Sequence, residues 1–194
     1  PSSETMTLSC SRVTPAIGAV VTLPGELAEI SEEFADAVHA ALIEHSVLVF
    51  PDLNLDPTRM VELGAALGTL GMRHHSYRTH PDSDDVVVLT WEGDSKPDAA
   101  EWHSDMTYRP EPPFASILKA VEVPPVGGDT LWASMFAVHD ALDPGLRNDL
   151  EQLDAVHYMG AFRTGSYRVG GNDVMISRRS NAGTAEHHVS HPTP

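Results

Sequence analysis

The stretch "WHSDMTYRPEPP", residues 102–113, is the most informative part of the chain. It places an imidazole, His103, two residues before a carboxylate, Asp105, with Trp102 and Tyr108 as aromatic neighbours. On a β-strand, residues i and i+2 point to the same face of the sheet. If this stretch is a strand, an imidazole nitrogen and a carboxylate oxygen can converge on a single metal ion.

A histidine and a carboxylate from one strand would supply two ligands of a 2-His-1-carboxylate site. That arrangement leaves metal positions open for substrate and oxygen in non-heme Fe(II) oxygenases. The bare H-x-D pattern, however, occurs by chance in many proteins. On these residues alone, a simple His–Asp hydrogen bond at the end of a strand is the favoured interpretation, and the surrounding sequence has to distinguish the two.

The composition is that of a globular protein with an acidic surface. The 194 residues are enough for one domain with a core, and 41% of them are hydrophobic. A net charge of −16, from 12 Lys and Arg against 28 Asp and Glu, argues against nucleic acid and anionic membranes as partners. A small anionic substrate held by a few local cations remains compatible with this charge.

The cellular location is predicted from three features of the sequence. Cys10 is the single cysteine, so an intramolecular disulfide is excluded and a reducing compartment fits. No apolar run approaches the length of a membrane span, and the first residues lack the regions of a signal peptide. We therefore expect a cytoplasmic protein, with the oligomeric state, a homo-oligomer included, left open.

The patterning along the chain predicts mixed helices and strands, with no internal repeat and no linker. Ser31 and Asp56 are the expected N-caps of the first two helices, and Gly68 or Gly71 should end the second. The expected helices are 30–46, 55–71, 134–142 and 144–153. The expected strands lie within 5–15, 19–23, 47–50, 84–91, 114–123 and, after a Gly-Gly turn, 127–134; the tail from residue 160 is expected to be loop.

Strands that cluster around residues 102–113, with helices before and after them, predict an α+β or β-sandwich arrangement. A doubly wound nucleotide-binding fold is less expected. The chain has neither a G-x-G-x-x-G after a strand nor a G-x-x-x-x-G-K-[ST] loop.

The neighbours of the H-x-D pattern carry a resemblance to a known family. The run Trp-His-x-Asp-x-Thr-Tyr, followed by a strand and Gly-Gly-x-Thr-x-Trp, resembles the taurine dioxygenase (TauD/TfdA) family of Fe(II)/2-oxoglutarate-dependent oxygenases. The matching residues are Trp102, His103, Asp105, Thr107, Tyr108, Gly127, Gly128, Thr130 and Trp132. The helix–strand–helix order before them is similar too, so the resemblance covers roughly residues 10–160.

This resemblance implies a fold and a reaction. The fold would be mainly β, a double-stranded β-helix (a distorted, cupin-like jelly roll) with flanking helices. His103 and Asp105 would bind Fe(II), and Thr130 would hydrogen-bond the distal carboxylate of 2-oxoglutarate, because a carboxylate entering a barrel needs donors. The enzyme would be a dioxygenase that uses O2 to hydroxylate a small molecule, with succinate and CO2 as the other products.

The resemblance also suggests where the substrate binds. His74 and Tyr77 match a His and a Tyr, three residues apart, that bind the sulfonate region in the taurine enzyme. Ala99, Phe162 and Arg163 depart from that enzyme's residues at corresponding places. These departures favour a larger or more apolar anionic substrate than taurine, such as a sulfonate, a sulfate ester or an aryloxy acid.

The family's second iron-binding His, and the Arg that pairs with 2-oxoglutarate, lie far beyond the first His. Residues 1–194 are therefore expected to be a single oxygenase domain, incomplete at its C-terminus. His187, His188 and His191 are interpreted as loop residues, and none of them is nominated as the third ligand.

Two other classes of function fit the same residues. One is a zinc-type hydrolase or lyase on a cupin-like barrel, with His103, Asp105 and a tail histidine as ligands. The other is a metal-binding relative without catalytic activity.

Overall fold

The computed structural model describes residues 6–51, 53–71, 77–93, 102–107 and 109–157, and the backbone of two later strands at 175–178 and 189–192. The chain divides into two compact units. The first comprises Pro1–Val88 and Ala115–Ala137, and the second comprises Leu89–Phe114 and Val138–Pro194. In the described part of the chain, no helix is both long and apolar enough to cross a membrane.

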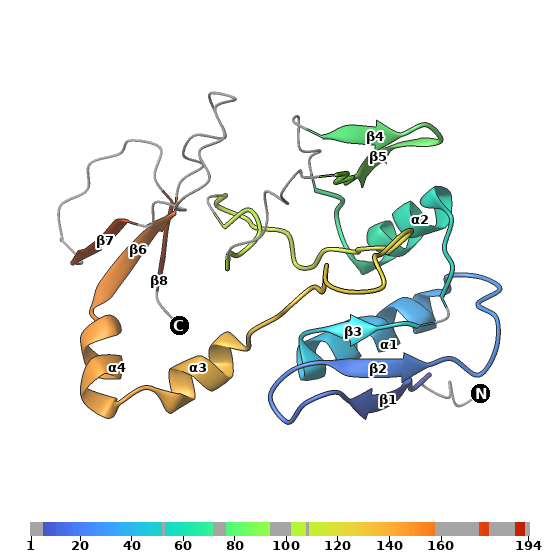
Figure 1. The fold of residues 1–194 in the computed structure, drawn as a ribbon. Coiled ribbons are helices and arrows are strands. Elements are labelled where there is room, and N and C mark those ends of the chain that lie inside the picture. The colour runs from blue at the N-terminus through green and yellow to red at the C-terminus, as the bar shows by residue number, and fades with distance from the viewer. Residues whose placement is uncertain are drawn as a thin grey trace. The chain divides into compact units, whose positions relative to one another are not determined.

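The first unit contains a three-stranded sheet. Its middle strand β2 (Ala19–Thr22) pairs antiparallel with β1 (Ser9–Arg12) and parallel with β3 (Leu48–Val49), as Figure 1 shows. Ala19 and Val21 alternate along β2 and are both buried, so one face of this strand belongs to the core. The expected strands are confirmed here, although the third is shorter than expected.

Helix α1 (Glu32–His45) begins where the sequence predicts, with Ser31 as N-cap. The Ser31 hydroxyl accepts a hydrogen bond from the backbone N–H of Phe34, which satisfies one of the donors left open at a helix start. Hydrogen bonds from its own backbone N–H and from Ser31 also hold the pKa of the Glu33 carboxyl below its ordinary value. The cap and the first turn therefore specify this helix start locally.

At the opposite end of α1, Glu44 reaches back to β1. Its carboxylate lies 2.9 Å from Nη2 of Arg12, an exposed ion pair that contributes little to stability.

Burial, and secondarily the negative charge of Glu44, raise the pKa of the Cys10 thiol above its ordinary value. The thiol is therefore kept protonated and is a poor nucleophile at neutral pH.

Helix α2 (Pro57–Leu67) starts at Asp56 and ends at Gly68, as the sequence predicts. It packs beside α1 and contacts β5 (Ser83–Val88). Between them the two helices and the loop before α2 build the core of the first unit, whose buried members are Phe34, Val38, Leu55 and Leu63.

The N-cap of α2 gives a first prediction. Asp56 Oδ1 accepts a hydrogen bond of 2.9 Å from the backbone N–H of Arg59. Asp56→Ala should lower the free energy of unfolding by about 1 kcal/mol, because that donor loses its partner. Asp56→Asn keeps a side-chain oxygen and should stay close to the wild type. Urea denaturation of the three proteins checks this, and an equal loss in both variants would contradict a capping role.

A two-stranded hairpin precedes His103 and Asp105 in the chain. Strand β4 (Arg78–His80) pairs antiparallel with β5, with a register shift between Thr79 and His80. The strand expected at 84–91 is confirmed in its first part, whereas β4 was not expected, because three residues are too few for a periodic pattern.

The strand expected at 114–123 is not formed in this structure, and neither is the strand expected within 127–134. The Gly-Gly turn before the latter is formed, with φ of 79° at Gly127 and 73° at Gly128. A strand needs a neighbour for its backbone N–H and C=O groups. None of the three sheets formed by the described strands includes a strand from the segment 114–134, so the backbone ladder that its pattern suggests is not made there.

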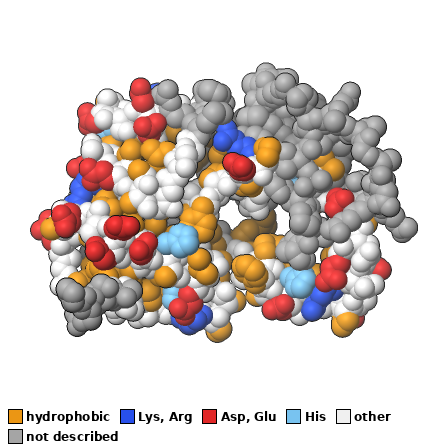
Figure 2. All heavy atoms as spheres, turned by 180° about the vertical axis from the view of Figure 1, so that it is seen from behind, with side chains coloured by type: hydrophobic (Ala, Val, Ile, Leu, Met, Phe, Trp, Pro, Cys, Tyr) orange, Lys and Arg blue, Asp and Glu red, His pale blue; other side chains and the backbone are white. Residues whose placement is uncertain are grey.

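Side chains of this segment are correspondingly exposed. Val121 and Val126 are each 88% exposed, and apolar side chains stand at the surface beside acidic ones in Figure 2. Within the first unit, Lys119 connects this segment to the loop before α2, because its Nζ donates to Asn54 Oδ1 and to the carbonyl of Leu55, both at 2.7 Å.

The second unit contains most of one short helix, all of a second one and a three-stranded sheet. Helices α3 (Met135–Ala141) and α4 (Pro144–Leu150) lie where the sequence predicts them. The sheet has the order β7-β6-β8, with β6 (Leu153–His157) antiparallel to both β7 (Met175–Arg178) and β8 (Val189–Pro192). The expectation that the tail from residue 160 is loop is wrong at β7 and β8, because their pairing with β6 outweighs their weak local pattern.

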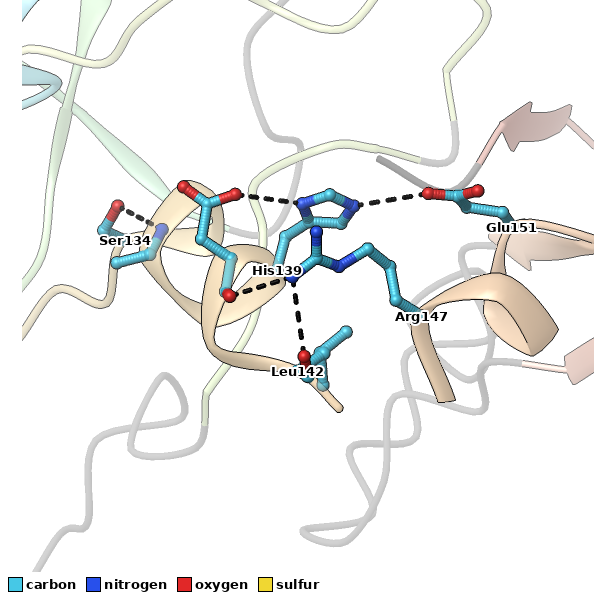
Figure 3. A network of polar contacts seen from close by, with 7 residues as sticks. Ser134, His139, Leu142, Arg147 and Glu151 are labelled. Carbon is cyan, nitrogen blue, oxygen red and sulfur yellow. Dashed lines mark hydrogen bonds and ion pairs between the residues drawn. The ribbon is translucent and has the colours of Figure 1, made fainter. Parts of the chain in front are cut away.

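The turn between α3 and α4 is held by a polar network (Figure 3). His139 lies between two carboxylates, 3.4 Å from Asp140 and 3.7 Å from Glu151. Arg147 Nη2 donates to the backbone carbonyls of Asp140, at 2.8 Å, and Leu142, at 3.5 Å. This network orients α4, which leads directly into β6.

The architecture is therefore mixed α and β, with antiparallel pairing in each of the three sheets. The double-stranded β-helix stays a prediction, because the described strands form three small sheets rather than one barrel.

Candidate metal centre

His103 and Asp105 lie together in the second unit. His103 Nε2 is 3.2 Å from Asp105 Oδ1, and both side chains are partly exposed, at 38% and 60%. The chain achieves this approach through a turn rather than through the strand considered for the H-x-D pattern. Residues 105–107 form the turn, Met106 has a φ of 52°, and the Arg109 N–H donates to the Met106 carbonyl.

The separation of the two donor atoms fits a shared metal ion. Imidazole nitrogens and carboxylate oxygens bind divalent metals at about 2.1 Å. Two such ligands at about 90° around an octahedral ion are about 3.0 Å apart, close to the observed 3.2 Å. The same distance also suits a direct hydrogen bond between the side chains. The pair therefore provides two adjacent ligand positions with the donor types that iron accepts.

A third ligand is not found among the described residues. In that part of the chain, no group of three or more His, Cys, Asp or Glu side chains is placed to hold a metal. His191 lies in β8, where its backbone is paired with that of Ala155. His187 and His188 are outside the described residues.

A second polar pair involves Thr107, two residues after Asp105. The Thr107 hydroxyl is 2.8 Å from His157 Nδ1, in a partly buried position. Thr107 is two residues after Asp105, and His157 is the last residue of β6. Thr107 was expected only as part of the family pattern, and His157 was not expected at the site. The sequence around His157 is apolar-rich and offers no further indication of a role.

The remaining predicted site residues belong to the first unit or lie outside the description. Thr130 is exposed and follows the Gly127–Gly128 turn. Tyr77 is half-buried and immediately precedes β4, whereas His74 lies outside the described residues. Their roles toward 2-oxoglutarate and substrate stay predictions.

Comparison with known proteins places this geometry in a family. The model of the taurine catabolism dioxygenase TauD, TfdA family matches residues 10–193. A relative from Sphingobium herbicidovorans named (S)-phenoxypropionate/alpha-ketoglutarate-dioxygenase is 33% identical over 149 residues, which are 72% of this chain and 50% of that protein. A Saccharomyces cerevisiae relative named alpha-ketoglutarate-dependent sulfonate dioxygenase is 28% identical over 190 residues, which are 89% of this chain and 43% of that protein.

This chain is also similar to a solved structure. The crystal structure of a taurine dioxygenase from Burkholderia xenovorans is similar with a TM-score of 0.60 and 26% identity, over 80% of this chain and 56% of that one. The chain thus spans about half the length of the curated relatives that it matches. Because the family model covers nearly every residue, from before β2 to beyond β8, the chain belongs to the taurine catabolism dioxygenase TauD, TfdA family.

Proposed function

We propose that the protein is an Fe(II)/2-oxoglutarate-dependent dioxygenase. It hydroxylates a small anionic organic molecule of the sulfonate, sulfate ester or aryloxy acid type. The observation that carries the proposal is the 3.2 Å approach of His103 Nε2 and Asp105 Oδ1, within the residues 10–193 that the family model matches. The names of the two relatives, which mention phenoxypropionate and sulfonate, support the substrate class. Residues 1–194 act in this proposal as part of a single oxygenase domain.

His103 Nε2 and Asp105 Oδ1 would hold the iron. With iron and 2-oxoglutarate bound, the site supplies oxidising chemistry in which one atom of O2 enters a substrate C–H bond and the other enters succinate, with release of CO2. The protein's own contribution is to orient the reacting molecules and to limit competing reactions. Both iron donors are partly exposed, so an ion can reach them from solvent.

Thr130 would donate its hydroxyl hydrogen to the distal carboxylate of 2-oxoglutarate. The turn before it requires glycine, since Gly127 and Gly128 both have positive φ. At Gly128 an added Cβ would also lie 3.1 Å from Pro124 Cγ. These constraints fix the direction in which the chain approaches Thr130. His74 and Tyr77 would bind the anionic group of the substrate.

The test of the function is substrate-dependent succinate formation. The full-length protein is incubated with Fe(II), 2-oxoglutarate and O2 together with alkyl sulfonates, alkyl sulfate esters or aryloxy acids. We expect one class to give succinate and a hydroxylated product in equal amounts. Turnover that persists without O2 or 2-oxoglutarate would contradict the proposal, as would the absence of succinate with all three classes.

The role of Thr130 gives a separate prediction. Thr130→Val removes the hydroxyl at nearly constant volume and should raise KM for 2-oxoglutarate by about tenfold or more, because a hydrogen bond to a charged group contributes about 1.5–3 kcal/mol. Thr130→Ser keeps the hydroxyl and should show a KM close to that of the wild type. Steady-state kinetics at saturating substrate measure both values, and an unchanged KM in Thr130→Val would exclude this contact.

A further inference from the structure

We propose that His157 is a positioning residue for the metal site and acts on Asp105 through the hydroxyl of Thr107. The inference rests on the proposed function, because it assumes a metal on His103 and Asp105. His157 itself lies on another element, 50 residues further along the chain from Thr107.

The contact itself is short and shielded. Thr107 Oγ1 and His157 Nδ1 are 2.8 Å apart and partly buried, which is a good distance for a hydrogen bond. Either the hydroxyl donates to an unprotonated Nδ1, or a protonated Nδ1 donates to the hydroxyl oxygen. In both cases the Thr107 side chain is tied to the ring of His157.

The position of His157 in the sheet holds its backbone in place. It ends β6, the central strand, which pairs with β7 on one side and with β8 on the other. The backbone of His157 itself pairs with that of Val189. A central strand is the best-supported part of a sheet, since both of its edges are hydrogen-bonded.

The metal-binding segment, in contrast, has no regular secondary structure. Residues 102–104 are irregular, and residues 105–107 form a turn with Met106 in the left-handed region. A non-glycine residue in that conformation is held there by its surroundings. Asp105 and Thr107 flank Met106, so a side chain that fixes Thr107 also restricts the direction of the Asp105 carboxylate.

Outer partners of this kind are known to matter for metal affinity. Hydrogen-bonded groups that orient ligands typically change affinity by 10- to 100-fold when they are removed. Thr107 acts on Asp105 through the backbone rather than by direct contact, so we expect the lower end, about tenfold.

The experiment measures Mn(II) affinity of the full-length protein by calorimetry in the presence of 2-oxoglutarate. Thr107→Val and His157→Leu should each weaken Mn(II) binding about tenfold. Thr107→Ser keeps the hydroxyl, and His157→Asn can place a polar atom near the position of Nδ1, so both should recover most of the affinity. His139→Leu, which removes a histidine near two carboxylates elsewhere in the second unit, is the matched control and should bind Mn(II) like the wild type.

The outcomes separate this inference from the proposed function. If Asp105→Ala binds Mn(II) as tightly as the wild type, the metal assignment fails and the inference fails with it. If Asp105→Ala loses binding but Thr107→Val keeps wild-type affinity, the function stands and the positioning role is overturned. Equal losses in Thr107→Val and Thr107→Ser, or a matching loss in His139→Leu, would also overturn it, because they indicate a general folding defect. If His157→Leu fails to fold, as judged by circular dichroism, the comparison of the two Thr107 variants decides.

Discussion

Asp105→Ala in the full-length protein is expected to lower 2-oxoglutarate-dependent succinate formation by more than about 100-fold. This is more than the loss of about 10- to 100-fold that is typical when a group that only orients a metal ligand is removed. The variant removes the carboxylate that would bind iron in the proposed site, whose Oδ1 lies 3.2 Å from His103 Nε2. His103→Ala should have an effect of similar size. Succinate release, measured with a substrate found active in the wild type, checks both variants.

The chain contains a natural control for this prediction. His80 and Asp82 form a second H-x-D pattern, with Nδ1 of the histidine 3.8 Å from Oδ2 of the carboxylate. This pair lies at the β4–β5 turn and has no part in the proposed site. Asp82→Ala should therefore keep wild-type turnover. If succinate formation survives Asp105→Ala, or falls equally in Asp82→Ala, the assignment of iron to His103 and Asp105 is wrong.

The parts of the fold that were predicted correctly are those determined by neighbouring residues. Ser31 and Asp56 are capping residues whose partners lie three positions away, at Phe34 and Arg59. Such signals are contained in a few consecutive residues, so both helices begin where the sequence indicates. The Gly127–Gly128 turn is of the same kind, because positive φ at both positions favours glycine.

The strands were predicted less well because a strand depends on its partner. β6 pairs with β7 and β8, whose sequences lie about 20 and 35 residues further along and carry only weak alternation. The segment 114–123 shows the opposite error, since its sequence suits a strand but it joins none of the three sheets that the described strands form. For His103 and Asp105 a strand was considered as the way to bring the two side chains together, whereas a turn does so in the structure.

The residues of the candidate site differ in the same way, because some have a local sequence signal and others do not. His103 and Asp105 were identified because their chemistry and the family pattern lie within a few residues. His157 was missed because it meets Thr107 only after the second unit has folded. A single histidine near the end of an unrecognised strand carries no local signal of that contact.

Phe34→Ala is expected to have the largest effect on stability, a loss of about 3–5 kcal/mol in the free energy of unfolding. Phe34 is 1% exposed and packs with Val38, Leu55 and Leu63, so the substitution leaves a cavity at the centre of the first unit. Urea denaturation, monitored by circular dichroism, measures this loss in the unfolding transition of the first unit.

Ile43→Ala is the matched control for Phe34→Ala, because it removes an apolar side chain from the same helix at a position that is 68% exposed. It should change the free energy of unfolding by no more than about 0.5 kcal/mol, as is usual for surface substitutions. Ala has a higher helix propensity than Phe and Ile, so propensity acts in the same direction in both variants. The difference between their free energies of unfolding therefore reports the effect of burial. Similar losses in both variants would mean that the core of the first unit does not lie between α1 and α2. The packing of the β4–β5 hairpin, whose strand β5 contacts α2, would then not depend on that core either.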